Sequence, residues 1–116
     1  MEKRKFQRVP QDIATHLIGG AVPSGADTRI RIYELSAGGV SFESKVVIRV
    51  GDSVQFDIPL AVPVQATAKI VRSFRKGDTI CHAGFFFGLR DTDQNVLNSY
   101  VTMQIQALGL KPLPED

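Results

Sequence analysis

The feature that most constrains the fold is a succession of short strand-like segments, followed by a single change to helical spacing. The segments are rich in Val, Ile, Thr and Phe and lie near residues 12–20, 28–35, 39–45, 53–60, 64–75 and 80–89. Between them stand turn residues such as Gly51-Asp52 and Lys76-Gly77-Asp78, the last of which is typical of a hairpin turn. The pattern predicts six β-strands.

Alternation along these segments indicates how the strands lie in a sheet. Val54, Phe56 and Ile58 share one face of the fourth segment, and Gln55 and Asp57 share the other. This is the period of a half-buried antiparallel strand. Six short strands of this kind favour a closed or nearly closed barrel, because closure removes exposed strand edges.

The last strand-like segment contains the run Phe85-Phe86-Phe87. Alternation places a set of apolar residues on one face: Cys81, Ala83, Phe85, Phe87 and Leu89. An aromatic run can stack on nucleic-acid bases. We expect core packing instead for two of the three phenylalanines.

The period changes at Asp91. Apolar residues then recur at helical spacing, at Leu97, Val101, Ile105 and Leu108. Asp91 is interpreted as the N-cap, with Gln94 three residues later as in a capping box. The sequence therefore predicts one amphipathic helix, about residues 91–108, whose apolar stripe packs on the barrel or on a partner.

Composition limits the class of protein. The 116 residues correspond to one domain, and a net charge of +2 is too low for a strongly basic nucleic-acid binder. Cys81 is the only cysteine, which excludes an intramolecular disulfide and fits a reducing compartment. No apolar run approaches the ~20 residues of a membrane helix. We expect a cytoplasmic protein without membrane insertion.

Two short polar segments are candidates for binding. The first, Arg4-Lys5-Phe6-Gln7-Arg8, has two arginines four positions apart just before the first strand. The second is the turn Glu34-Leu35-Ser36-Ala37-Gly38-Gly39 between two strands. The expected organisation is a basic arm (1–10), a barrel with its helix (11–109) and a loose tail (110–116).

These residue types suit a ligand with both phosphates and guanines. The planar guanidinium fork donates two parallel hydrogen bonds to a phosphate or to the O6 and N7 edge of guanine, and it stacks on purines. In the turn, a carboxylate at Glu34 can accept from guanine nitrogens, and Ser36 can donate and accept. Gly39 is expected to provide a backbone conformation closed to other residues, so that the ligand approaches closely.

The order of these motifs resembles the PilZ domain family, whose signature is RxxxR followed 20–30 residues later by (D/N)xSxxG. The similarity extends over residues 4–106. It includes Gly51-Asp52-Ser53-Val54, Ala68-Lys69-Ile70-Val71-Arg72, Gly84-Phe85-Phe86-Phe87 and Leu97-Asn98-Ser99-Tyr100-Val101.

The resemblance implies an all-β fold: a six-stranded antiparallel barrel of the split-barrel type with a C-terminal helix. It also implies binding of cyclic di-GMP (c-di-GMP) without enzymatic activity and without a cofactor. Arg4 and Arg8 then grip phosphate and guanine, and Ser36 and Gly39 belong to the second motif. Lys3 occupies the position that influences whether one ligand molecule or a stacked pair is bound.

Glu34 departs from the family pattern, which has Asp or Asn there. Glutamate is one methylene longer, so it either accepts from guanine after a small shift, crowds the pocket, or pairs with Arg31 or another base on the barrel surface. The primary hypothesis is a c-di-GMP receptor, monomer or homodimer, that regulates a protein partner in trans in motility, adhesion or exopolysaccharide synthesis.

Two alternatives remain open. One is a PilZ-like interaction domain whose ligand binding is weak or lost because of Glu34. The other is a small nucleic-acid-binding barrel, although the low net charge leads us to expect no DNA. A metal site is not expected either, because adjacent strand residues such as Cys81 and His82 point to opposite faces.

Overall fold

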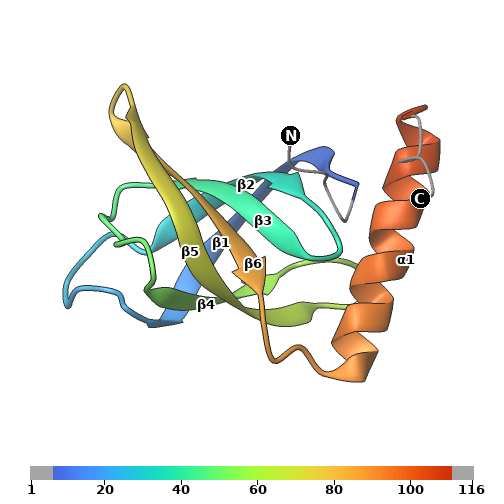
Figure 1. The fold of residues 1–116 in the computed structure, drawn as a ribbon, viewed down its shortest axis with the longest axis horizontal. Coiled ribbons are helices and arrows are strands. Elements are labelled where there is room, and N and C mark those ends of the chain that lie inside the picture. Colours follow the sequence, from blue (N-terminus) through green and yellow to red (C-terminus); the bar gives the residue numbers. More distant parts are fainter. Residues whose placement is uncertain (1–6, 111–116) are drawn as a thin grey trace.

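Six antiparallel strands form a closed barrel, and one helix follows them (Figure 1). This is the arrangement in a computed structural model that describes residues 7–110. The strands are β1 (Val9–Gly20), β2 (Arg29–Leu35), β3 (Gly39–Ser44), β4 (Ser53–Ile58), β5 (Val64–Lys76) and β6 (Thr79–Phe86). They pair in the order β1-β2-β3-β6-β5-β4, and β4 closes the barrel onto β1. The predicted all-β barrel with a C-terminal helix is confirmed.

Strand β1 begins earlier than expected, at Val9 rather than near residue 12. Val9 pairs with Leu35 and Pro10 pairs with Glu34, so the chain enters the sheet directly after Arg8. The proline fits here because it stands at the start of a strand, where a missing N–H is tolerated.

The interior of the barrel is filled by the alternate residues of every strand. In β4, Val54, Phe56 and Ile58 are fully buried, as the alternation predicted. The rings of Phe42 and Phe56 meet with centroids 6.0 Å apart in a tilted arrangement. Such aromatic pairs stabilise the core by about 0.5–1.5 kcal/mol beyond the area they bury.

A histidine is part of this interior. His82 has no exposed surface, and its ring lies 5.2 Å from that of Phe42. Its Nε2 is 3.1 Å from both Ser44 Oγ and the carbonyl of Val46, and its Nδ1 is 2.8 Å from Ser73 Oγ. Burial lowers the pKa of His82. The histidine therefore connects β3, β5 and the segment after β3 from inside the barrel.

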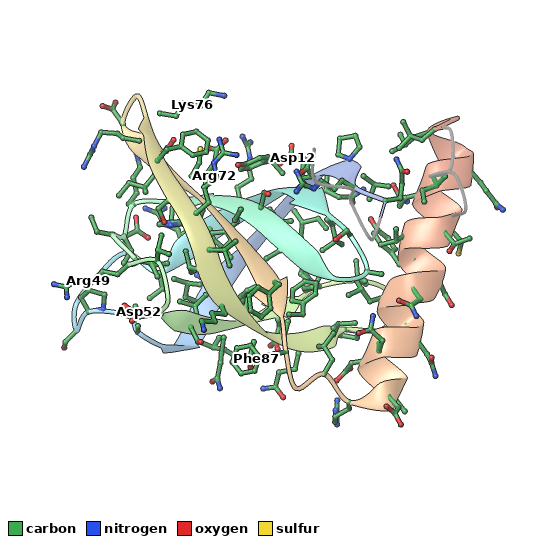
Figure 2. All side chains as sticks on the ribbon, in the orientation of Figure 1. Asp12, Arg49, Asp52, Arg72, Lys76 and Phe87 are labelled. Carbon is green, nitrogen blue, oxygen red and sulfur yellow. The ribbon has the colours of Figure 1, made fainter. Side chains whose placement is uncertain are left out.

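The expectation that two of the three phenylalanines pack in the core is wrong. Phe86 is partly buried, but Phe85 and Phe87 are 45% and 46% exposed. In β6 the inward residues are Ile80, His82 and Gly84, so the opposite phase, which includes Phe85, faces outward. Figure 2 shows Phe87 beyond the end of β6, away from the barrel interior.

Helix α1 (Asp91–Ala107) lies across one end of the barrel, and the β5–β6 hairpin projects from the other (Figure 1). Leu97 and Val101 are buried and join the barrel core. The predicted capping box is wrong: the N-cap is Arg90, which makes no side-chain cap hydrogen bond, and Asp91 is the first helical residue.

The two ends of this helix differ. At its start Arg90 Nε donates to buried Asp93 at 2.8 Å, and this bond raises the pKa of Arg90. At its end Gly109 has a φ of 65°, and Leu110 N–H donates to the carbonyl of Ile105, as in a Schellman motif. Between residues 7 and 110 no helix combines the length and the apolar character needed to cross a membrane.

Candidate functional site

The two sequence motifs meet where β1 begins and β2 ends. Arg8 Nη1 lies 3.4 Å from Glu34 Oε1, and the two side chains are 48% and 32% exposed. The register that pairs Pro10 with Glu34 fixes this approach through the backbone. Lys3 and Arg4, the other predicted residues of the arm, lie outside the described residues.

A β-bulge sets the direction of Glu34. Between Ile32 and Glu34 the register of β2 against β3 shifts by one, with Tyr33 as the additional residue. In a regular strand Glu34 would share the inward face of Ile32. The bulge reverses the phase, so that Leu35 is buried and Glu34 faces the surface. Without the bulge the motif carboxylate would lie inside the barrel.

The turn after β2 is held by Ser36. Its Oγ accepts from the N–H of Gly39 at 2.9 Å and of Gly38 at 3.3 Å, and its own N–H donates to the carbonyl of Gly39 at 2.9 Å. The residue is only 9% exposed. Ser36 thus shapes the turn from within, and a direct bond from its hydroxyl to a ligand stays a prediction.

The special backbone conformation expected for Gly39 is wrong. Gly39 is not among the glycines with positive φ, so its backbone conformation is open to other residues. The constraint is a close approach of two strands. A Cβ on Gly39 would lie 2.5 Å from the carbonyl oxygen of Gly84 in β6. Glycine at this position lets β3 and β6 pair at the motif turn.

The outer face of the barrel continues from Glu34 as a row of small side chains. Across the sheet Glu34 pairs with Ser41, Ser41 with Ala83, and Ala83 with Arg72. Three strand spacings separate Glu34 from Arg72, about 14 Å. Between Glu34 and Arg72 this row contains only Ser41 and Ala83, and the side chain of Tyr33 lies beside it. Arg72 lies over the ring of Phe74, 5.1 Å from its centroid.

An exposed aromatic ring borders this row. Phe85 pairs with Gly39 on one side and with Lys69 on the other. Because Gly39 has no side chain, the face of the barrel beside the phenyl ring is unobstructed there. Together Phe85 and Lys69 provide an apolar surface and a cation next to the motif turn.

Helix α1 contacts both halves of the site. Gln94 Nε2 donates to the carbonyl of Ala37 in the turn at 2.9 Å. Tyr100 Oη donates to Gln11 Oε1 at 2.5 Å, and Gln11 Nε2 donates to Gln104 at 3.1 Å. Gln94 was interpreted from the sequence as a capping residue. In the structure it joins the helix to the second motif.

A separate hollow of about 300 Å³ lies near the far ends of β2 and β3. Its arginines already have carboxylate partners: Arg29 with Asp27 at 2.7 Å, and Arg31 with Asp12 at 2.9 Å. The bond from Arg29 holds the pKa of Asp27 well below its usual range. Of the partners that the sequence left open for Glu34, Arg31 or another base, the structure gives another base, Arg8. Arg8 is held less closely than either arginine of the hollow, since its carboxylate partner Glu34 is 3.4 Å away.

Among residues 7–110 no three His, Cys, Asp or Glu side chains gather as a metal site would require. Cys81 and His82 lie on opposite faces of β6. The hydroxyl of Tyr33 lies near Cys81 and Ser41 on the outer face, and burial followed by Cys81 raises the pKa of Tyr33.

A family model for the PilZ domain matches residues 2–103. The chain belongs to the PilZ domain family. These are ligand-binding receptor domains and not enzymes. A search of the curated proteins gave no significant match.

Solved structures show the same fold. The Bacillus subtilis inhibitor of motility MotI/DgrA aligns with a TM-score of 0.75 and 18% identity over 91% of this chain and 53% of its own. The PilZ domain of Escherichia coli YcgR, solved with c-di-GMP, aligns with a TM-score of 0.65 and 15% identity, covering 92% and 95% of the two chains. MrkH of K. pneumonia, solved as a c-di-GMP complex, gives 0.74 and 10%, covering 94% and 55%. The chain thus spans about half the length of MotI/DgrA.

Proposed function

We propose that the chain is a c-di-GMP receptor that uses no additional cofactor. The observation that carries the proposal is the strand register that holds Arg8 beside the Glu34–Gly39 turn. Membership of the PilZ family supports it, as do the c-di-GMP complexes of YcgR and MrkH.

The described surface suits a ligand with phosphates and purines. Arg8 is half exposed and presents a planar donor for phosphate or guanine. The row from Ser41 to Ala83 leaves room for the ligand across the sheet, and Arg72 offers a second cation. Phe85 gives a purine an apolar face on which to stack. We propose that Lys3 and Arg4 complete the site from the arm.

The proposed output is made in trans. The anionic ligand neutralises the arm and holds it against the barrel, which creates a new surface for a protein partner. Through Gln94 and Gln11, helix α1 touches both the turn and the beginning of β1, so a shift at the site reaches the helix. We place the regulated process among motility, adhesion and exopolysaccharide synthesis, and the protein in the cytoplasm.

Isothermal titration calorimetry with c-di-GMP tests the proposal. Arg8→Ala is expected to weaken binding about 10- to 100-fold, because a charge-assisted hydrogen bond contributes about 1.5–3 kcal/mol. Arg31→Ala is the matched control, since this arginine is also exposed but pairs with Asp12 instead. We expect the control to bind like the wild type.

Absence of heat at tens of micromolar protein would refute the receptor function and favour an interaction domain that has lost its ligand. Equal affinity in wild type and Arg8→Ala would remove Arg8 from the site. Tighter binding of short single-stranded DNA than of c-di-GMP, with a steep salt dependence, would favour the nucleic-acid-binding alternative.

A further inference from the structure

The pairing of Glu34 with Arg8 bears on how the site is regulated. The guanidinium that we assign to phosphate has a carboxylate 3.4 Å away. A carboxylate and a phosphate bind the same planar fork of N–H donors. Contact with one oxyanion therefore reduces contact with the other.

The pairing is selective. Arg31, on the same strand as Glu34, is engaged by Asp12 at 2.9 Å. The bulge at Tyr33 and the pairing of Pro10 with Glu34 direct the Glu34 carboxylate toward Arg8 instead. Glu34 is paired within β2, and Arg8 directly precedes Val9, the first paired residue of β1, so the sheet register brings the two side chains together.

We propose that Glu34 is an internal competitor of the ligand: its carboxylate occupies Arg8 and must be displaced by a ligand phosphate. This inference rests on the proposed function and adds a specific regulation of that site. It assigns the effect of Glu34 to its charge.

The expected effect is modest because the pair is exposed. Ion pairs of this kind have small free energies, so the competition lowers affinity about two- to fivefold. Salt screens the pair, and the difference between variants should shrink as ionic strength rises.

The closing experiment compares c-di-GMP affinity in Glu34→Gln, Glu34→Asp and Asp12→Asn by calorimetry at low salt. Glu34→Gln keeps the length and an acceptor oxygen but removes the charge, and it should bind about two- to fivefold more tightly. Glu34→Asp keeps the charge and should gain less. Asp12→Asn removes one negative charge, as Glu34→Gln does, but from the ion pair with Arg31 and not from the pair with Arg8. This variant should bind like the wild type.

Several results would overturn the inference while leaving the receptor function intact. These are unchanged or weaker binding in Glu34→Gln, an equal gain in Asp12→Asn, or a gain in Glu34→Asp that matches or exceeds that of Glu34→Gln. The last result would assign the effect to side-chain length.

If no variant binds c-di-GMP, the proposed function fails and a second readout decides the competition. Inorganic pyrophosphate is titrated while the Nε–H resonance of Arg8 is followed by NMR. Saturation at lower pyrophosphate in Glu34→Gln than in wild type supports the competition. Identical titrations contradict it.

Discussion

Replacing Gly39 with alanine should destabilise the protein even without ligand. The new Cβ would lie 2.5 Å from the carbonyl oxygen of Gly84, whereas ordinary contact begins near 3.4 Å. Strands β3 and β6 must therefore separate by nearly an ångström at a point where they are hydrogen-bonded. Overpacking against a backbone atom that cannot move aside costs about 3 kcal/mol, which lowers the Tm by about 10–20 °C.

Gly19→Ala is the matched control. Its Cβ would also approach an oxygen closely, but this oxygen ends the exposed, flexible side chain of Gln55, which can turn away into water. Neither Gly19 nor Gly39 has a positive φ, so neither substitution introduces backbone strain of the left-handed kind. The control should be neutral or stabilising by up to about 1 kcal/mol, since alanine reduces the entropy of the unfolded chain.

Thermal unfolding followed by circular dichroism measures both variants in the absence of ligand. Equal Tm values for Gly39→Ala and Gly19→Ala would refute the steric argument. The requirement for glycine at position 39 would then have to come from the ligand, as the sequence first suggested.

Three further predictions concern the barrel and its helix. Burial lowers the pKa of His82, so the unfolded chain binds the proton of this histidine more readily than the folded protein does. Below the unfolded pKa of about 6.5, the free energy of unfolding should therefore fall by up to about 1.4 kcal/mol per pH unit, as measured by urea denaturation. Leu97→Ala should cost about 2–5 kcal/mol in the same assay, since the side chain is fully buried between helix and barrel. Gln94→Ala removes the bond to Ala37 and should cost about 1 kcal/mol, with faster hydrogen exchange of the turn amides.

Each of these has a control and a contradicting outcome. If stability still falls below pH 6.5 in His82→Gln but no longer does so in His16→Gln, then His16, and not His82, causes the pH effect. Met103→Ala, on the exposed face of α1, should change stability by less than about 0.5 kcal/mol; a loss equal to that of Leu97→Ala would mean that the helix packs differently. Unchanged exchange of the turn in Gln94→Ala would mean that the helix does not hold it.

The class of fold could be predicted because barrel strands and a covering helix have different periods. Alternation, however, defines two faces of a strand without showing which is internal. In β6 one set of alternate residues includes Phe85, and the other contains Ile80, His82, Gly84 and Phe86. His82 lies inside because it finds hydrogen-bond partners there, on β3, on β5 and at the carbonyl of Val46. No pattern along β6 itself reveals these partners.

The candidate site was predictable in composition but not in geometry. The types and order of Arg8, Glu34, Ser36 and Gly39 pointed to their motifs. Their contacts depend on strand pairing: the bulge that turns Glu34 outward, and the carbonyl of Gly84 that requires a glycine opposite. Gln94 resembled a capping residue because it stands three positions after Asp91. Its contact with Ala37 joins positions 57 residues apart in the sequence, and no local pattern shows such a contact.

The pairing of Val9 with Leu35 and of Pro10 with Glu34 has a consequence for the length of chain between the two motifs. Main-chain hydrogen bonds hold the motifs side by side, and the connection between β1 and β2, residues 21–28, lies at the opposite end of that hairpin. Lengthening the connection leaves the site in place, and doubling it costs only about 0.6 kcal/mol of loop-closure entropy. The number of residues between an RxxxR motif and the turn that lies beside it can therefore vary widely among homologous chains. The number of residues between each motif and the first paired residue of the adjoining strand cannot vary in this way.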